Sequence, residues 1–350
     1  MNILVILTGG TILSAVSGEY IGLNENQGSA LLQMYTEYAT KPVHFDCVSP
    51  YTILSENLNG SYIQRLIDCI RSYIPDTCAP DKTYDGIIIA HGTDTLQYTA
   101  AGLYHEFMHC GLPIVLVSSN YVLEDARANG FANFAAAVSF IRQHLGNGVY
   151  IAYQNNSVWG ELSPVYFHHG NRVLPYAVYS DTLHSVNDSY FCKILPQMHG
   201  EYVDYETYEL NTQADTSISS PDDTSVLPEN SGILMLYATP GIYYPKPEKD
   251  MKAILLITYH SGTLPTDDRY FCDFVQKAHT MEIPVYVLGA PTVPVSTTRE
   301  AMPVPECSDT SSDNSKLPYE STARYEELHL KLLPVMSPAD AYMWLYRFYA

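Results

Sequence analysis

Basic residues are scarce in this chain, and the shortage excludes several kinds of partner. Lys and Arg together number 18 against 38 Asp and Glu in 350 residues, which gives a formal charge of -20 at pH 7. Phosphate backbones and anionic membrane surfaces are bound through clustered Lys and Arg. The sequence therefore predicts neither nucleic acid nor a membrane as a partner.

Long apolar runs and paired cysteines are missing as well. No apolar stretch approaches the ~20 residues that cross a bilayer as a helix. The seven cysteines stand apart without a CxxC pair, so we expect free thiols and no metal site. The first apolar run starts at Ile3 with no basic segment before it, which predicts no secretory signal peptide.

Apolar runs alternate with helical patterns along the chain, which predicts an α/β fold. Nearly continuous apolar runs are typical of parallel strands covered on both faces. The predicted strands are Ile3–Leu7, Ile87–Ala90, Ile114–Ser118, Val149–Tyr153, Ile233–Tyr237, Ala253–Thr258 and Pro284–Leu288. The predicted helices are Tyr62–Ile74, Leu96–His109 and Asn133–Leu145. A last helix is expected after the N-cap residue Ser337, with Pro338 at its first position.

An acidic, polar stretch divides the strand series into two parts. Residues 200–230 hold eight acidic residues and no Lys or Arg, which is typical of a solvated connector. A chain of 350 residues is also longer than one core usually serves. We predict a larger N-terminal α/β domain with a mostly parallel sheet at 1–199, an acidic linker at 200–230, and a smaller C-terminal α/β domain with a parallel sheet at 231–350.

Two glycine–threonine turns follow predicted strands and carry the candidate chemistry. The first strand runs into "TGGTI", which contains Gly10 and Thr11. The second runs into "HGTDT", which contains Gly92, Thr93 and Asp94. Each motif alone also fits ordinary helix capping by Thr and Asp. Ligands of open α/β sheets bind beyond the carboxyl ends of the strands, and two hydroxyls with a carboxylate there supply the groups needed for acyl transfer.

These two motifs, in this order and spacing, resemble the signatures of bacterial-type L-asparaginases, most closely the cytoplasmic (type I) members. Other stretches are similar to segments of that family, namely "LSENL", "DARANGFANFAAAV", "GILMLYATPG" and "KAILLITYHSGTLP". The resemblance implies a cytoplasmic amidohydrolase that converts asparagine to aspartate and ammonia without a cofactor. It also implies a homodimer or homotetramer, because the family forms its active sites between subunits.

The resemblance implies roles for individual residues. Thr11 would be the nucleophile that forms a β-aspartyl ester, and Tyr20 would be the lid tyrosine hydrogen-bonded to it. Among 30 tyrosines, Tyr20 also fits an ordinary loop position. Thr93 and Asp94 would form a second threonine–carboxylate pair, and Asp94 would contact the substrate ammonium. The residues that would bind substrate are Gly10, Ser55, Glu56, Gly92, Thr93 and Asp94.

One position departs from the family pattern. After "GNR", cytoplasmic members continue with two threonines and the lysine that completes the second triad. This chain has Val173, Leu174 and Pro175 there, and no lysine lies between Lys82 and Lys193. The cation expected beside the second threonine is therefore missing from this segment.

Three nearby residues are candidates to replace that cation. Arg172, His168 and His169 would supply positive charge to Asp94, or they belong to ordinary surface-loop chemistry. Glu56 is a second departure, because the family usually carries a neutral Gln or Ser there. A carboxylate would grip a substrate ammonium and repel an α-carboxylate, which leaves the substrate preference open.

Several functions remain open at this point. Asparaginase is the leading hypothesis. Glutaminase–asparaginase and the amidase subunit of a tRNA-dependent amidotransferase are alternatives; the latter usually has an extra domain before the TGGT strand, with which this chain begins. The missing lysine also fits a non-catalytic asparagine- or aspartate-binding sensor. Ammonia release, measured beside calorimetric binding, distinguishes an enzyme from a sensor.

Overall fold

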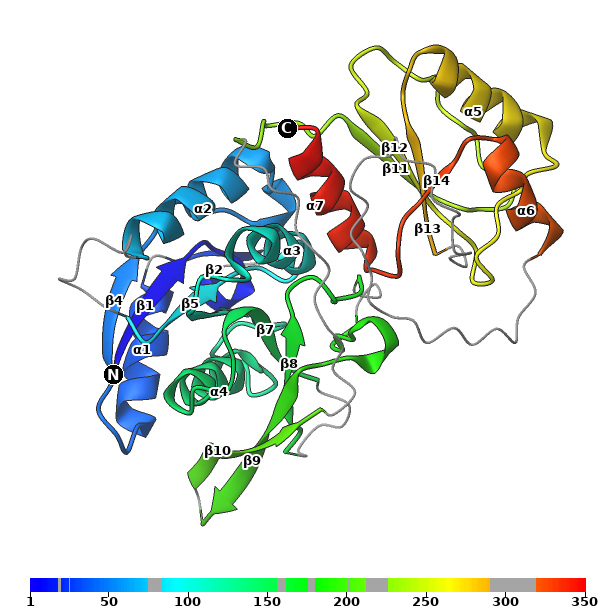
Figure 1. Cartoon of the computed structure of the whole chain (residues 1–350). Helices are drawn as coiled ribbons and strands as arrows, with labels where there is room; N and C mark the ends of the chain where they lie inside the picture. Colours follow the sequence, from blue (N-terminus) through cyan, green and yellow to red (C-terminus); the bar gives the residue numbers. More distant parts are fainter. Residues whose placement is uncertain are drawn as a thin grey trace. The chain divides into compact units, whose positions relative to one another are not determined.

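The apolar runs near the start of the chain form the central strands of an eight-stranded sheet (Figure 1). The structure is a computed structural model that describes residues 1–17, 20–24, 26–74, 84–155, 162–175, 180–200, 202–211, 226–289 and 319–350. The chain forms two compact units, Met1–Asp215 and Thr216–Ala350. The first has a large, mostly parallel sheet and the second a smaller parallel one. This confirms the predicted α/β class, while the boundaries at 199 and 231 stay predictions.

Five neighbouring strands of the first unit run parallel, in the order β7-β6-β5-β1-β4. Four of them match the predicted strands to within one residue at each end. The fifth, β4, was not predicted because its exposed and half-buried residues mix polar with apolar side chains. The bounds are β1 Asn2–Leu7, β4 His44–Val48, β5 Gly86–Ala90, β6 Pro113–Val117 and β7 Gly148–Gln154.

Helices cover both faces of this sheet (Figure 1). Side chains alternate between the faces of a strand, and Ile3 and Val5 of β1 point to the face where Leu31 of α1 and Phe134 of α4 pack. Helices α2 and α3 contact each other and lie on the opposite face. The three predicted helices of this unit are α2, α3 and α4, each found within three residues of its expected bounds. The bounds are α1 Gln27–Tyr38, α2 Gly60–Tyr73, α3 Leu96–Phe107 and α4 Gly130–Arg142.

Three antiparallel strands extend the sheet beyond β7. They are β8 Val165–His169, β9 Cys192–His199 and β10 Tyr202–Leu210. Strand β10 therefore lies within the segment 200–230 that the sequence analysis predicted as a linker, and residues 212–225 lie outside the described part of the chain. Val203 and Tyr205 of β10 alternate with acidic residues and pack against the core. The high acidic content concealed this two-residue alternation.

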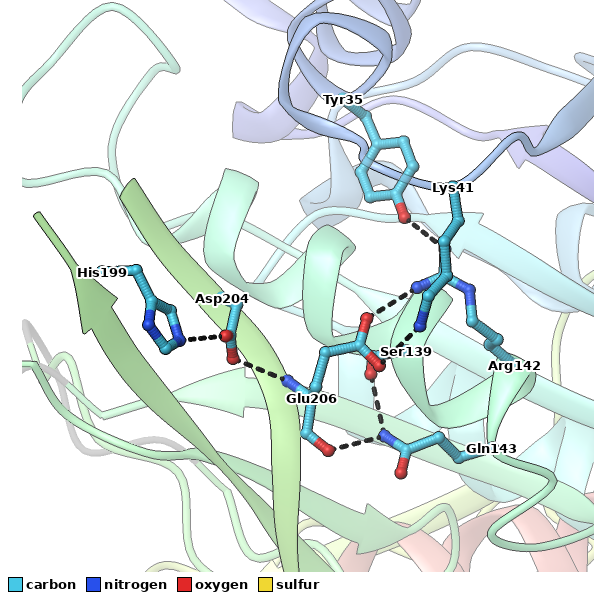
Figure 2. A network of polar contacts seen from close by, with 8 residues as sticks. All are labelled: Tyr35, Lys41, Ser139, Arg142, Gln143, His199, Asp204 and Glu206. Atoms are coloured by element: carbon cyan, nitrogen blue, oxygen red, sulfur yellow. Dashed lines mark hydrogen bonds and ion pairs between the residues drawn. The ribbon is translucent and has the colours of Figure 1, made fainter. Parts of the chain in front are cut away.

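A polar network fixes β10 to the helices beneath it (Figure 2). Arg142 at the end of α4 donates from Nη1 to Glu206 Oε1 at 2.9 Å and from Nη2 to the Tyr35 hydroxyl at 3.0 Å. Gln143 Nε2 donates to the Glu206 backbone oxygen at 3.0 Å. Lys41 Nζ adds an ion pair at 3.6 Å from Glu206 Oε2. One acidic residue of the supposed linker is therefore held by α4 and by the segment that follows α1.

The second unit repeats the layered arrangement on a smaller scale. Its four parallel strands are β11 Ile233–Tyr237, β12 Ala253–Ile257, β13 Val285–Leu288 and β14 Lys331–Leu332. Phe271 of α5 (Arg269–Thr280) and Tyr325 of α6 (Glu320–Glu327) pack on one face, and Trp344 of α7 (Pro338–Phe348) packs on the other.

The capping signals identified in the sequence are present at the start of α7. Ser337 accepts a hydrogen bond from the Asp340 backbone N–H at 3.1 Å, and Pro338 is the first helical residue, as predicted. Within the described residues, no helix combines the length and the apolar character needed to cross a lipid bilayer.

Candidate active site

The two glycine–threonine turns leave neighbouring strands at the same edge of the sheet. Strands β1 and β5 pair in parallel, with Leu7 opposite Ala90. Thr8 continues this register, because its backbone N–H donates to the Ala90 oxygen at 3.1 Å and its hydroxyl donates to the same oxygen at 2.9 Å. Gly9 and Gly92, where the two turns begin, therefore each lie two residues beyond the paired residues Leu7 and Ala90.

The glycines of the two turns lie in backbone contact. Gly10 has φ +80°, and a Cβ atom on it would lie 2.2 Å from the Gly92 Cα atom. Gly9 has φ +117°, and a Cβ atom there would lie 2.0 Å from the Ile53 backbone oxygen. Both φ values are in the region that favours glycine, and both close approaches exclude a side chain. The glycines are thus required by conformation and by space.

Ser55 lies on the other side of Gly92. It begins a short 3-10 helix at Ser55–Asn57, and its side chain is buried. A Cβ atom on Gly92 would lie 2.5 Å from Ser55 Oγ. Ser55 Oγ donates to Asp94 Oδ2 at 3.1 Å, and the Thr95 hydroxyl donates to the Ser55 backbone oxygen at 3.0 Å. The structure thus joins the segment after β4 to the HGTDT motif.

The residues of the first motif lead into a small hairpin. Thr11 is half-buried and begins the 3-10 helix Thr11–Leu13, directly after Gly10. The chain then forms β2 Ser14–Ser17 and β3 Tyr20–Leu23, an antiparallel pair in which Tyr20 lies opposite Ser17. Tyr20 is therefore the first residue of the second strand in the hairpin that follows Thr11–Leu13. Its role at the nucleophile stays a prediction.

The residues of the second motif precede helix α3. Thr93 is half-buried and Asp94 is exposed. The Thr93 backbone oxygen accepts from the Leu96 N–H at 3.3 Å, where α3 begins. Thr11 and Thr93 thus each follow one glycine of the touching pair. Glu56 is exposed in the short helix beside Ser55.

The groups predicted to replace the lysine expected from the family resemblance bind other partners. Arg172 is buried and donates from Nε to Ser189 Oγ at 3.2 Å. His168 is buried with Nδ1 at 2.7 Å from Ser185 Oγ, and burial lowers its pKa to about 3. His168 is therefore uncharged at neutral pH and brings no positive charge to the site.

His169 is also uncharged at neutral pH. Burial, with a smaller effect of the Arg172 charge, lowers the pKa of His169 to about 4. Within the described residues, none of the three candidates forms an ion pair with Asp94, so that expectation is wrong for this part of the chain. Leu174 is half-buried and Pro175 is exposed at the position expected for lysine. The carboxylate of Asp94 has Ser55 as its hydrogen-bond donor instead.

The arrangement brings together residue types that acyl transfer uses. Two threonines, a carboxylate that accepts from a serine hydroxyl, and tightly turned backbone lie at one edge of the sheet. Across the described ranges, no group of three or more His, Cys, Asp or Glu is arranged to hold a metal ion.

His91 lies inside the HGTDT motif and had no predicted role. Its buried ring bridges the Gly92 backbone oxygen and the Thr99 hydroxyl of α3. The sequence could have indicated that His91 is buried, because it directly follows the apolar run that forms the fully buried strand β5. Its two partners became visible only with the packing of α3 against that strand.

Solved structures share this fold over nearly the whole chain. An L-asparaginase from Thermococcus kodakarensis, described as thermostable, aligns with a TM-score of 0.66 at 21% identity and covers 98% of this chain and 91% of that chain. L-asparaginase I from Vibrio cholerae aligns with a TM-score of 0.66 at 19% identity, covering 99% and 92%. At these identities the likeness defines the fold class, which is that of the solved L-asparaginases.

The family follows from the sequence itself. The model of the asparaginase N-terminal domain matches residues 2–203, which is more than half of the chain. The chain belongs to the asparaginase family. This confirms the resemblance drawn from the motifs TGGTI and HGTDT.

Curated relatives introduce a second type of family member, a component of the glutamyl-tRNA(Gln) amidotransferase. The protein of this name from Methanobrevibacter smithii is 34% identical over 153 residues, which is 41% of this chain and 32% of the relative. Its counterpart from Saccharolobus solfataricus is 25% identical over 245 residues, or 69% of this chain and 51% of the relative. The chain thus spans about half or less of these relatives.

Proposed function

We propose that this protein hydrolyses the side-chain amide of L-asparagine to L-aspartate and ammonia through a threonine acyl-enzyme. The observation that carries the proposal is the contact between Gly10 and Gly92, because it brings Thr11 and Thr93 onto touching turns. The family membership supports an amidohydrolase. The solved structures with this fold are described as L-asparaginases, which supports asparagine as the substrate.

The residues would act in two steps. In the first, the Thr11 hydroxyl oxygen attacks the amide carbon, the hydroxyl proton passes to the leaving nitrogen, and ammonia departs. In the second, water attacks the β-aspartyl ester, and Thr11 regains its proton as aspartate leaves. Thr93 and Asp94 would relay protons for one of these steps, and Tyr20 would contact the nucleophile.

Substrate binding would use the groups around Gly92. Asp94 is exposed and would accept hydrogen bonds from the substrate ammonium, while Ser55 Oγ holds one of its oxygens. Glu56 is exposed one residue further along and would add a second negative charge. Two carboxylates attract the ammonium of L-asparagine and repel its α-carboxylate, so we expect L-asparagine to bind weakly.

The central experiment is an ammonia-release assay on the purified protein. L-asparagine, L-glutamine and D-asparagine are compared in parallel, with calorimetric binding of each measured on the same preparation. Hydrolysis of L-asparagine that is lost in Thr11→Val supports the proposal. Hydrolysis that survives in Thr11→Val contradicts the assigned nucleophile.

The curated relatives favour a second candidate function. Their name describes one component of an amidotransferase, so this chain would release ammonia for transfer to an acceptor held by another protein. Glutamine labelled with ¹⁵N in its amide tests this idea. Label that appears as free ammonia at a high rate from the isolated chain supports an independent hydrolase, whereas hydrolysis too slow to detect supports a component of a larger enzyme.

The missing lysine favours a third candidate, a sensor that binds asparagine or aspartate without hydrolysis. Pro175 occupies the position of the cation, and no described Lys, Arg or His pairs with Asp94. Calorimetric binding without ammonia release would select this function. Ammonia release therefore separates the hydrolase from the other two candidates, and the amino acid that binds, glutamine or else asparagine or aspartate, separates the amidotransferase component from the sensor.

Assembly and location follow the proposed family role. We propose a homodimer or homotetramer, which light scattering tests against the 39.1 kDa mass of one chain. We also propose a cytoplasmic location. A structure from Campylobacter jejuni with the same fold, at 17% identity and a TM-score of 0.65, is described as a probable cytoplasmic L-asparaginase.

A further inference from the structure

His91 is a buried polar side chain that the proposed reaction does not use. It is 2% exposed at the carboxyl end of β5. Nδ1 lies 2.8 Å from the Gly92 backbone oxygen, and Nε2 lies 2.9 Å from the Thr99 hydroxyl. The ring therefore connects the turn that carries Thr93 to the first turns of helix α3.

The two contacts determine which ring nitrogen carries the proton. A carbonyl oxygen only accepts hydrogen bonds, so Nδ1 is the protonated nitrogen and donates to Gly92. Burial lowers the pKa of His91 to about 4, so the ring is neutral near pH 7 and Nε2 is an acceptor. Thr99 must then donate its hydroxyl proton to Nε2.

Gly92 is the residue through which this ring can affect the site. It lies against Gly10 on one side and Ser55 on the other. A shift of the Gly92 peptide would therefore displace the HGTDT turn relative to the TGGTI turn. The His91 ring holds the carbonyl of the same residue. Thr93 and Asp94 follow Gly92 directly in the chain. Their backbone therefore starts from a residue that Gly10, Ser55 and the His91 ring all contact.

We propose that His91 is a positioning residue of the candidate site, which holds the Gly92 peptide and thereby aims Thr93 and Asp94. The inference rests on the proposed function for its effect on catalysis. Its geometric part, that the ring restrains the turn through Gly92 and Thr99, stands on the contacts alone.

A purely structural role makes a different prediction from a positioning role. If His91 only fills space, loss of its hydrogen bonds lowers the melting temperature and leaves kcat/KM of the folded protein unchanged. If it positions the turn, displacement of reacting groups by fractions of an ångström lowers kcat/KM even where the protein is fully folded.

The variants remove one contact at a time. Thr99→Val deletes the donor to Nε2 and keeps the shape, and Thr99→Ser retains the hydroxyl. His91→Asn places an amide N–H near the position of Nδ1 and loses the contact to Thr99. Thr36→Val is the matched control, because it also removes a threonine hydroxyl from a helix, on the exposed side of α1.

Two readouts need no activity. Ring ¹⁵N NMR on the wild-type protein should show Nδ1 protonated and Nε2 bare, with the His91 signal assigned by its loss in His91→Asn. Hydrogen exchange of a peptide covering residues 91–96 should be faster in Thr99→Val than in wild type, with Thr99→Ser and Thr36→Val unchanged. An Nε2-protonated ring, or equal exchange in Thr99→Val, overturns the inference.

The third readout is kcat/KM for L-asparagine. We expect about a tenfold loss in Thr99→Val and in His91→Asn, and most of the activity retained in Thr99→Ser. Wild-type values in Thr99→Val overturn the positioning role while the proposed function stands. If the wild-type protein neither hydrolyses nor binds asparagine, the proposed function fails, and the exchange comparison alone supports or overturns the restraint by His91.

Discussion

Gly10 and Gly92, 82 residues apart in the chain, lie so close that a Cβ atom on Gly10 would be 2.2 Å from the Gly92 Cα atom. Gly10→Ala therefore combines a steric clash with a strained φ of +80°. Gly111 has a similar φ of +76° with open space around it, so Gly111→Ala adds only the strain.

We expect Gly111→Ala to lower the free energy of unfolding by about 1 kcal/mol, and Gly10→Ala to lower it by several times that amount and to abolish activity. Chemical denaturation of both variants measures the difference. Equal losses of stability would show that the two turns do not touch in solution.

Thr11→Val tests the proposed nucleophile. The substitution keeps the shape of the side chain and removes the oxygen, so we expect kcat to fall by about three orders of magnitude or more. Binding of L-aspartate, measured by calorimetry, should remain within a few-fold of wild type. Thr36→Val in α1 is the control and should retain full activity, since that exposed hydroxyl donates to the Leu32 backbone oxygen of its own helix.

Ser55→Ala tests the contact between the segment after β4 and the second motif. It deletes the hydrogen bond from Ser55 Oγ to Asp94 Oδ2 and leaves this carboxylate without that donor. We expect KM for asparagine to rise about tenfold with a smaller change in kcat, because hydrogen bonds to charged groups contribute about 1.5–3 kcal/mol. Ser72→Ala, on the exposed side of α2, is the comparison variant. A fall in kcat alone would place Ser55 in the chemistry instead.

Pro175→Lys restores the family residue at the departing position. The added ammonium would attract the Asp94 carboxylate and orient Thr93, so we expect kcat/KM near pH 7 to increase by about tenfold, the effect of ~1.4 kcal/mol of added transition-state stabilisation. Pro175→Met is the control, because the methionine side chain is similar in length to that of lysine and carries no charge. If both variants behave alike, flexibility from the loss of proline and not charge explains the change.

Two buried histidines predict how stability depends on pH. Burial lowers the pKa of His91 to about 4 and of His168 to about 3, both below the ordinary value of 6.5. The unfolded chain therefore binds protons between about pH 6.5 and pH 4 that the folded chain does not. The stabilisation is fully present above pH 6.5 and is lost as pH falls, by up to about 1.4 kcal/mol per pH unit for each histidine.

Urea denaturation between pH 7 and pH 4.5 measures this slope. His168→Gln should reduce the pH dependence of the free energy of unfolding by the part that one buried histidine contributes. An unchanged slope in His168→Gln would show that His168 is accessible to protons in the folded state.

The strands at the centre of each sheet could be predicted because their signal is local. Ile3–Leu7 and Ile87–Ala90 are uninterrupted apolar runs, and such runs form buried parallel strands in almost any α/β setting. The edge strands β4 and β10 could not be found this way, since they are only partly buried. In β10 the acidic residues are held by partners such as Arg142, far away in sequence.

The sequence by itself determined the family, because TGGTI and HGTDT are contiguous motifs whose spacing can be read along the chain. Tertiary structure alone decided which residues meet. The parallel register of β1 and β5 places Gly10 against Gly92, and the return of the chain after β4 brings Ser55 to Asp94. It also directs Arg172 to Ser189 and closes the His91 ring onto Thr99. These contacts depend on how distant segments pack, and packing is a property of the whole folded unit that no single stretch of sequence carries.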